Sequence, residues 1–266
     1  MKRTFYSVLL AVLLSGIATA HEFWLEPETF RPDATTESVS IQINVGMNFA
    51  GKLWGGSLPD ILEIPVATGS GTKYLASDGG LKEPLIELKA ETPGQYLVGL
   101  TNKSAFIELD ADAFKKYVLS EGLEQIVQQR ESLGESEQPG RELYRRCAKV
   151  LIQQGDDPEQ LSYDESFGFP VEFQALENPY EDGRELLSFK LLSQDEPLAD
   201  AQVVIWHKNG EELKRTDLRP NEDGIITLSL RQEGIWMVSS VHMERAEESE
   251  KADWQSYWAS YTFGYR

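Results

Sequence analysis

Three histidines are the residues of this 266-residue sequence best suited to bind a metal ion, and the first of them is His21. A secretory signal pattern precedes it, with Lys2 and Arg3, an apolar segment at residues 6–14 and the small-residue site Ala18-Thr19-Ala20. Cleavage there makes His21 the first mature residue. An N-terminal histidine offers its free α-amine and its ring Nδ1 together, a chelate that an internal histidine cannot form. We therefore expect a metal site at His21, the alternative being that cleavage before a histidine is incidental.

His207 and His242 are the other two histidines, and each lies where a predicted strand ends. His207 shares a strand face with Val203 and precedes a turn, and His242 shares a face with Trp236. Functional groups often lie at the ends of strands, so we expect one of these imidazoles to reach the metal with His21. The alternatives are a polar residue beside a turn for His207, and a half-buried histidine that donates to a backbone carbonyl for His242.

The predicted donors suit nickel, cobalt(II), copper(II) and zinc, and copper(II) binds such nitrogens most tightly. A carboxylate from Glu22, Glu26 or the acidic run at residues 244–253 is a further candidate ligand. The sequence contains no GxSxG, P-loop, HExxH or CxxC motif. We therefore expect a binding protein and not an enzyme. A copper protein with a histidine brace, either a carrier or an oxygenase, is one alternative, and a metal-free adaptor is another.

The composition excludes some partners. The formal charge is −19, and it becomes −21 when Lys2 and Arg3 leave with a signal peptide that contains no acidic residue. Such acidity argues against nucleic acid and anionic membranes as partners. The apolar N-terminal segment is too short to span a bilayer, so we expect no direct membrane insertion. Cys147 is the one cysteine, and a periplasmic location fits a chain without intramolecular disulfides.

Two regions of β pattern flank a helical one. Residues 39–45 alternate apolar and polar side chains as a half-buried strand does, and residues 95–100 and 105–109 suggest a hairpin. Further strands are predicted after residue 167, where Gly-containing turns separate short apolar runs.

The middle of the chain suggests helices. Asp110 is a predicted N-cap, and the apolar residues that follow it recur at helical spacing. A second helix is predicted over residues 141–154, with Cys147 on its buried face. The expected fold is mainly β, with two immunoglobulin-like β-sandwich modules bridged by a short helical segment. The expected division is a signal peptide at 1–20, modules at 21–109 and 161–266, and the helical segment at 110–160.

Several motifs resemble a family of exported bacterial proteins of unknown function, often labelled the periplasmic component of a cobalt or nickel transport system. They are His21-Glu-Phe-Trp-Leu-Glu-Pro27, Phe114–Leu123, Gly140–Arg146 with Lys149, Arg215-Thr-Asp217, Gly234–Val238, Val241-His-Met243 and Asp253–Ser260 with Thr262-Phe263. The resemblance implies a nickel or cobalt ligand, with His21 and His242 as carried-over residues, and an inner-membrane metal transporter as partner. The last strands also resemble carboxypeptidase-regulatory sandwiches.

Overall fold

Three β-sheets make up most of the computed structural model, which describes residues 22–75, 81–82, 85–156, 160–247 and 249–266. Sheet A contains β1 (Glu22–Pro27), β2 (Ser38–Met47), β3 (Ala50–Leu53), β7 (Leu81–Lys82) and β8 (Leu85–Lys89). Sheet C contains β12 (Val171–Ala175), β13 (Leu186–Ser193), β14 (Glu196–Pro197) and β17 (Ile225–Ser229).

Sheet B is the large central sheet, in the order β16-β15-β18-β19-β11-β9-β5-β6, with β10 beside β11 and β4 beside β9. Its strands are β4 (Ile61–Glu63), β5 (Pro65–Thr68), β6 (Gly71–Tyr74), β9 (Gly94–Asn102), β10 (Ala105–Leu109), β11 (Gly140–Gln154), β15 (Val203–Asn209), β16 (Glu212–Leu218), β18 (Ile235–Arg245) and β19 (Trp254–Gly264). β11 and β19 run parallel to each other at its centre.

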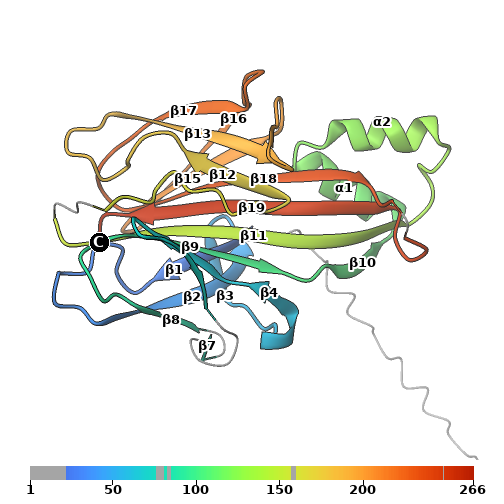
Figure 1. Ribbon diagram of the computed structural model, residues 1–266. Helices are drawn as coiled ribbons and strands as arrows, with labels where there is room; N and C mark the ends of the chain where they lie inside the picture. Colours follow the sequence, from blue (N-terminus) through green and yellow to red (C-terminus); the bar gives the residue numbers. More distant parts are fainter. Residues whose placement is uncertain (1–21, 76–80, 83–84, 157–159, 248) are drawn as a thin grey trace, which may run out of the picture.

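Sheet B lies between the other two sheets (Figure 1). Successive side chains of a strand point to opposite faces, and the two cores follow this alternation. Val204, Trp206 and Met237 pack in one core with sheet A, whereas Ile205 and Val238 pack in the other core with sheet C. The prediction of a mainly β fold of the sandwich class is confirmed. The central sheet takes strands from both sides of the predicted helical segment, however.

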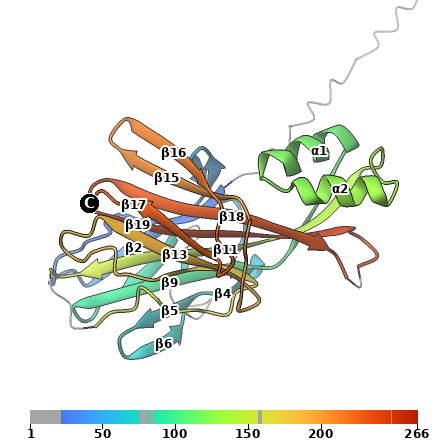
Figure 2. The same cartoon turned by 90° about the horizontal axis from the view of Figure 1, so that it is seen from above.

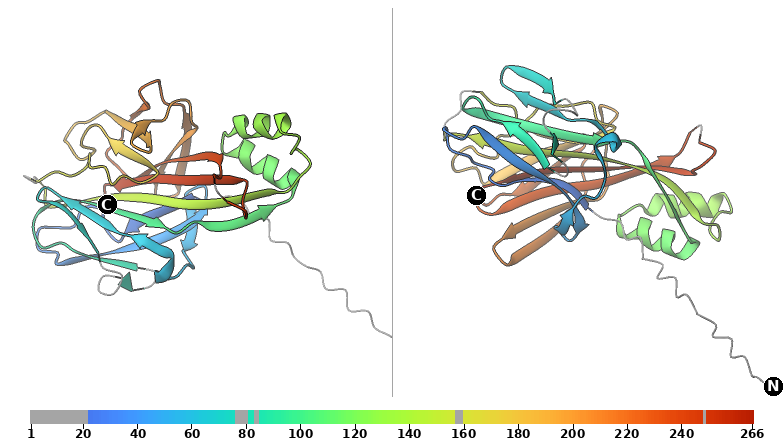
Figure 3. Two further views of the ribbon diagram at one scale, coloured as in Figure 1. Left: turned by 45° about the vertical axis from the view of Figure 1, so that its right-hand side comes forward. Right: turned by 90° about the horizontal axis from the view of Figure 1, so that it is seen from below.

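Two helices lie at one end of the long strands β11, β18 and β19 (Figures 1, 2 and 3), and a short 3-10 helix covers Leu58–Asp60. α1 (Ala111–Ser120) starts after the predicted N-cap, where the Asp110 carboxylate accepts a hydrogen bond of 2.8 Å from the Ala113 backbone N–H. α2 (Glu124–Ser132) follows after a turn. Their apolar side chains pack with Val241 and Met243 of β18, which by alternation lie on the face of sheet B that bears sheet A. None of the described helices is long and apolar enough to cross a membrane.

The predicted helix over residues 141–154 is wrong, because this segment is the central strand β11. Residues 147–152 are all buried, since sheet A covers one face of the strand and sheet C the other. A strand buried on both faces lacks polar residues at alternate positions, so its apolar run also fits helical spacing. The predicted packing role of Cys147 is confirmed, because this residue is buried.

The predicted hairpin between residues 95–100 and 105–109 is also wrong. β9 and β10 do not pair with each other; both pair with β11, β9 along Cys147–Gln154 and β10 along Gly140–Tyr144. They therefore lie end to end along one long partner strand, an arrangement that local turn signals cannot distinguish from a hairpin.

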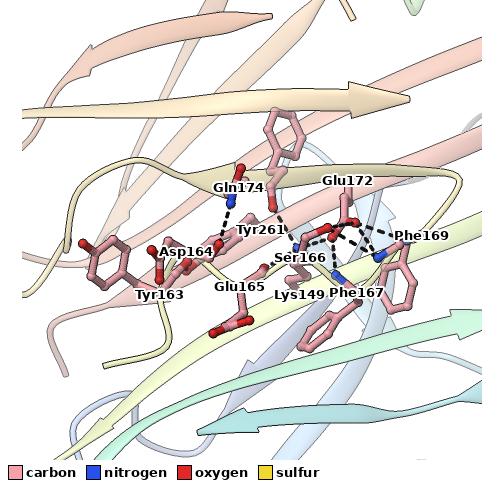
Figure 4. Close-up of polar contacts among 12 residues, drawn as sticks. Lys149, Tyr163, Asp164, Glu165, Ser166, Phe167, Phe169, Glu172, Gln174 and Tyr261 are labelled. Atoms are coloured by element: carbon pink, nitrogen blue, oxygen red, sulfur yellow. Dashed lines mark hydrogen bonds and ion pairs between the residues drawn. The ribbon is translucent and has the colours of Figure 1, made fainter. Parts of the chain in front are cut away.

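A buried ion pair connects β11 of sheet B to β12 of sheet C (Figure 4). Lys149 donates from Nζ to the backbone carbonyls of Glu165 and Phe173, both at 3.0 Å, and pairs with the Glu172 carboxylate. Glu172 also accepts hydrogen bonds from the backbone N–H groups of residues 167–169. Burial opposes ionisation of Glu172, but Lys149 and these hydrogen bonds hold its pKa below the usual range. The contacts of this pair hold the chain between the two sheets.

Candidate metal site beside helix α1

The predicted metal residue His21 lies outside the described residues, as does the predicted signal peptide, and the described chain begins with Glu22. Glu22 is the first residue of β1, a strand of sheet A that is also hydrogen-bonded to sheet B. It pairs with Gly46 of β2, and the following backbone carbonyl, that of Phe23, accepts a hydrogen bond of 2.7 Å from the Ser260 hydroxyl of β19. Adjacent Cα atoms are about 3.8 Å apart, so the surroundings of Glu22 are those that bear on a site at His21.

Glu22 lines a pocket of about 920 Å³ between the start of β1, helix α1 and the face of sheet B that bears sheet A. Four aromatic side chains line this pocket: Phe23 of β1, Tyr117 of α1, Trp206 of β15 and Trp258 of β19. The rings of Tyr117 and Trp258 are stacked, with centroids 6.1 Å apart. A cavity of this size and lining is typical of a site for a small molecule.

Charged side chains of both signs also line the pocket, and acids predominate. The acidic ones are Glu22, Glu108, Asp110, Asp112 and Glu121, and the basic ones are Lys116 and Arg215. An acidic cleft raises the local concentration of cations. The pocket is therefore suited to a positively charged ligand or part of a ligand.

Glu22 is close enough to Glu121 to oppose the ionisation of its carboxyl. Burial, together with the nearby charge of Glu22, raises the pKa of the Glu121 carboxyl to about 7, against the opposing effect of Arg215. Burial also raises the pKa of Glu22, although the Asn48 backbone N–H donates to its Oε1 at 3.3 Å. The other oxygen, Oε2, is buried and accepts no hydrogen bond from the described residues. A bound cation would stabilise both carboxylates in their ionised form.

Arg215 supplies a positive charge on the edge strand β16. Its guanidinium lies over the Trp206 ring, 5.4 Å from the ring centroid, and its Nε donates to Asp217 at 2.8 Å. Trp206 is 3% exposed, and its indole N–H has no acceptor among the described residues. The pocket thus combines carboxylates with an arginine and an unpaired donor.

The buried carboxyl of Glu142 is hydrogen-bonded to a side chain that lines the pocket. Glu142 of β11 accepts hydrogen bonds from the Tyr117 hydroxyl at 3.0 Å and from the Ser256 hydroxyl. The Trp258 indole N–H donates to the same serine oxygen at 3.1 Å. Burial raises the pKa of Glu142 to about 7. This network sets the positions of the two stacked rings.

His207 is buried in the core between sheets B and C. Its ring is stacked on Trp236 with centroids 4.0 Å apart, and its Nε2 donates to the Glu233 carbonyl at 3.0 Å. That hydrogen bond requires the proton on Nε2, because a carbonyl oxygen only accepts. Contacts within the protein thus engage both the ring face and Nε2 of His207.

His242 is half-buried near the far end of β18. Its Nε2 lies 3.9 Å from a carboxylate oxygen of Glu244, and burial lowers its pKa below the usual range, against the effect of Glu244. As predicted, it is on the same face of β18 as Trp236 and Val238, which is the face that bears sheet C.

The structure does not bring these two histidines together, nor does it bring either to the pocket. His207 is opposite Trp236 of β18, six residues from His242, which corresponds to roughly 20 Å along the strand. Both lie on the face of sheet B opposite to β1. In the described part of the chain no group of three or more His, Cys, Asp or Glu side chains has the geometry of a metal site.

The other acidic candidates are engaged elsewhere. Glu26 pairs with Arg266 at 2.8 Å, and Asp253 pairs with Arg141. Glu121 and Arg215 were not predicted as site residues. Both residues lie in motifs that carry the family resemblance, Phe114–Leu123 and Arg215-Thr-Asp217, and those motifs are the signal that could have found them.

Comparison with protein families gives one match. A family model described as "Domain of unknown function (DUF4198)" covers residues 18–244. No curated protein matches the sequence. Because the model covers most of the sequence, the chain belongs to this family, and the resemblance to a family of unknown function is confirmed.

Proposed function

We propose that this family member, once exported and cleaved after Ala20, binds a divalent transition metal ion, nickel or cobalt, with the amine and imidazole of His21. The observation that supports the proposal is the position of Glu22, one residue further on, in the pocket beside α1. A chelate at the mature N-terminus would then form next to two carboxyls whose ionised forms a cation would stabilise.

Glu22 and Glu121 are the proposed oxygen ligands. Each has a raised pKa because burial disfavours its charge, and a metal ion would remove that penalty by compensating the charge. Two nitrogens and one or two carboxylate oxygens form a donor set that nickel and cobalt accept. The copper histidine brace has less support, because it needs a second imidazole on the same face of the sheet and both described histidines are on the other.

The periplasm is the proposed location, and supply of the ion to a membrane importer is the proposed role. Both rest on the signal pattern and on the label carried by the family that the sequence resembles. A small acidic carrier without enzymatic motifs fits that role.

The test uses protein purified from the periplasm, with His21 verified as first residue by intact mass. Nickel, cobalt and copper affinities are measured by competition with a chromophoric chelator. Inserting one serine before His21 separates the amine from the imidazole chelate, and we expect affinity to fall at least tenfold, about 1.4 kcal/mol. Unchanged affinity would exclude the amine as a ligand.

A second pair of variants tests the carboxylate. Glu121→Gln is expected to weaken nickel binding and to make it less dependent on pH near neutrality, since protons compete with the metal for this group. Glu124→Gln changes the same charge on α2, outside the pocket, and is expected to bind as the unmodified protein does. Equal loss in both variants would indicate an effect of net charge alone.

A further inference from the structure

We propose that the pocket beside α1 takes the metal ion as a complex with a small carboxylate chelator, an amino acid or hydroxy acid, whose carboxylate binds Arg215. This inference rests on the proposed function and goes beyond it, because it assigns the interior of the pocket to an organic ligand.

The first argument is size. An ion with six water molecules occupies roughly 200 Å³, since each water accounts for about 30 Å³. The cavity measures about 920 Å³, several times more, and lies within the range of sites for small organic ligands. A site for a bare ion alone would not need this volume.

The second argument is the nature of the walls. Phe23 and Trp206 are each 3% exposed and form apolar surface behind the carboxylates, and Trp258 adds a third ring. Aromatic faces favour contact with the carbon skeleton of an organic molecule.

The third argument is that the pocket contains charges of both signs. The carboxylates of Glu22 and Glu121 favour the cation, whereas Arg215 favours an anion. Of the guanidinium nitrogens only Nε has a hydrogen bond to a described residue, so the two terminal nitrogens can hold a carboxylate in the fork geometry typical of arginine. The unpaired indole N–H of Trp206, beneath the guanidinium, is a further donor. A metal carboxylate complex carries both charges in one molecule and matches this arrangement.

The test is equilibrium dialysis of the mature protein with radiolabelled citrate or L-histidine, with and without one equivalent of nickel. We expect about one equivalent of chelator to be retained with nickel, at least tenfold more tightly than without it. Arg215→Ala should lower chelator affinity at least tenfold and leave nickel affinity in chelator-free buffer equal or higher, because a positive charge is removed. Arg215→Lys should give an intermediate loss.

Lys214→Ala is the matched control, because Lys214 is the preceding residue of β16, does not line the pocket and should have no effect. If nickel binds but no chelator is retained with it when both are present, or if the chelator strips nickel from the protein, this inference is overturned and the proposed function is left standing. Failure to bind nickel in chelator-free buffer would overturn both.

Discussion

Glu142 makes the stability of the protein depend on pH in a direction that the structure determines. The carboxyl is 1% exposed and is hydrogen-bonded at Oε1 by the hydroxyls of Tyr117 and Ser256. Its Oε2 has no hydrogen-bond partner in the described part of the chain, and no ion pair of this carboxyl is found there. Burial outweighs the two hydrogen bonds and raises its pKa to about 7.

A raised pKa in the folded state means that folding favours the protonated form. The contribution of Glu142 to stability is therefore fully present below its ordinary pKa of 4.5 and is lost as the pH rises to about 7. A shift from 4.5 to 7 corresponds to roughly 3 kcal/mol. Glu142→Gln removes this dependence, because the amide is neutral throughout. Its NH₂ group lacks an acceptor, which costs about 1–3 kcal/mol at every pH, so the variant is less stable below pH 4.5.

The assay is urea unfolding of the metal-free protein at several pH values between 4.5 and 7.5. Relative to Glu142→Gln, the unmodified protein should lose roughly 3 kcal/mol of unfolding free energy over this range. Glu131→Gln on the exposed surface of α2 is the control and should leave the profile unchanged. Parallel profiles for Glu142→Gln and the unmodified protein would refute the assignment of a buried, neutral carboxyl.

Two further predictions concern the buried ion pair of Lys149 with Glu172 and the histidine His242. Lys149→Met should lower the unfolding free energy at pH 7 by about 3–5 kcal/mol in urea titrations, because Glu172 is left ionised in the interior. Lys149→Arg should recover only part of this loss. A change below about 1 kcal/mol for Lys149→Met would contradict the buried ion pair. His242→Ala should change nickel affinity less than twofold in the competition assay, because this imidazole lies on the face of sheet B opposite to the pocket, and a tenfold loss would show that the metal site is on that face.

The strands with one exposed face were predictable from the sequence, and the central strand was not. β2 alternates buried and less buried residues and was predicted within two residues at each end. β11 is covered by sheets on both faces, so its pattern depends on partners that lie far away in the chain. Even a charged residue of this strand, Lys149, is buried, because Glu172 from another segment compensates its charge. Local periodicity carries no information about such partners.

The pocket was not predictable, because its walls come from distant segments. Glu22, Glu121 and Arg215 are separated by about a hundred residues each along the chain, and only the packing of the folded chain brings β1, α1 and β16 to one pocket. Each residue by itself is one charged side chain among many in an acidic sequence. His21 had a signal of its own, because a predicted cleavage site precedes it, and Glu22 was a candidate ligand beside it.

The assignment of side chains to faces explains why carboxylates and not imidazoles must complete a site at the mature N-terminus. Strand alternation correctly placed His242 with Trp236 and Val238, but alternation cannot tell which face of the sheet receives β1. The structure places β1 with Val204 and Trp206, on the other face. In the proposed function, an ion bound next to Glu22 would have acids, aromatic rings and Arg215 around it. Its binding should then follow the protonation of Glu121 near pH 7 more closely than that of another histidine.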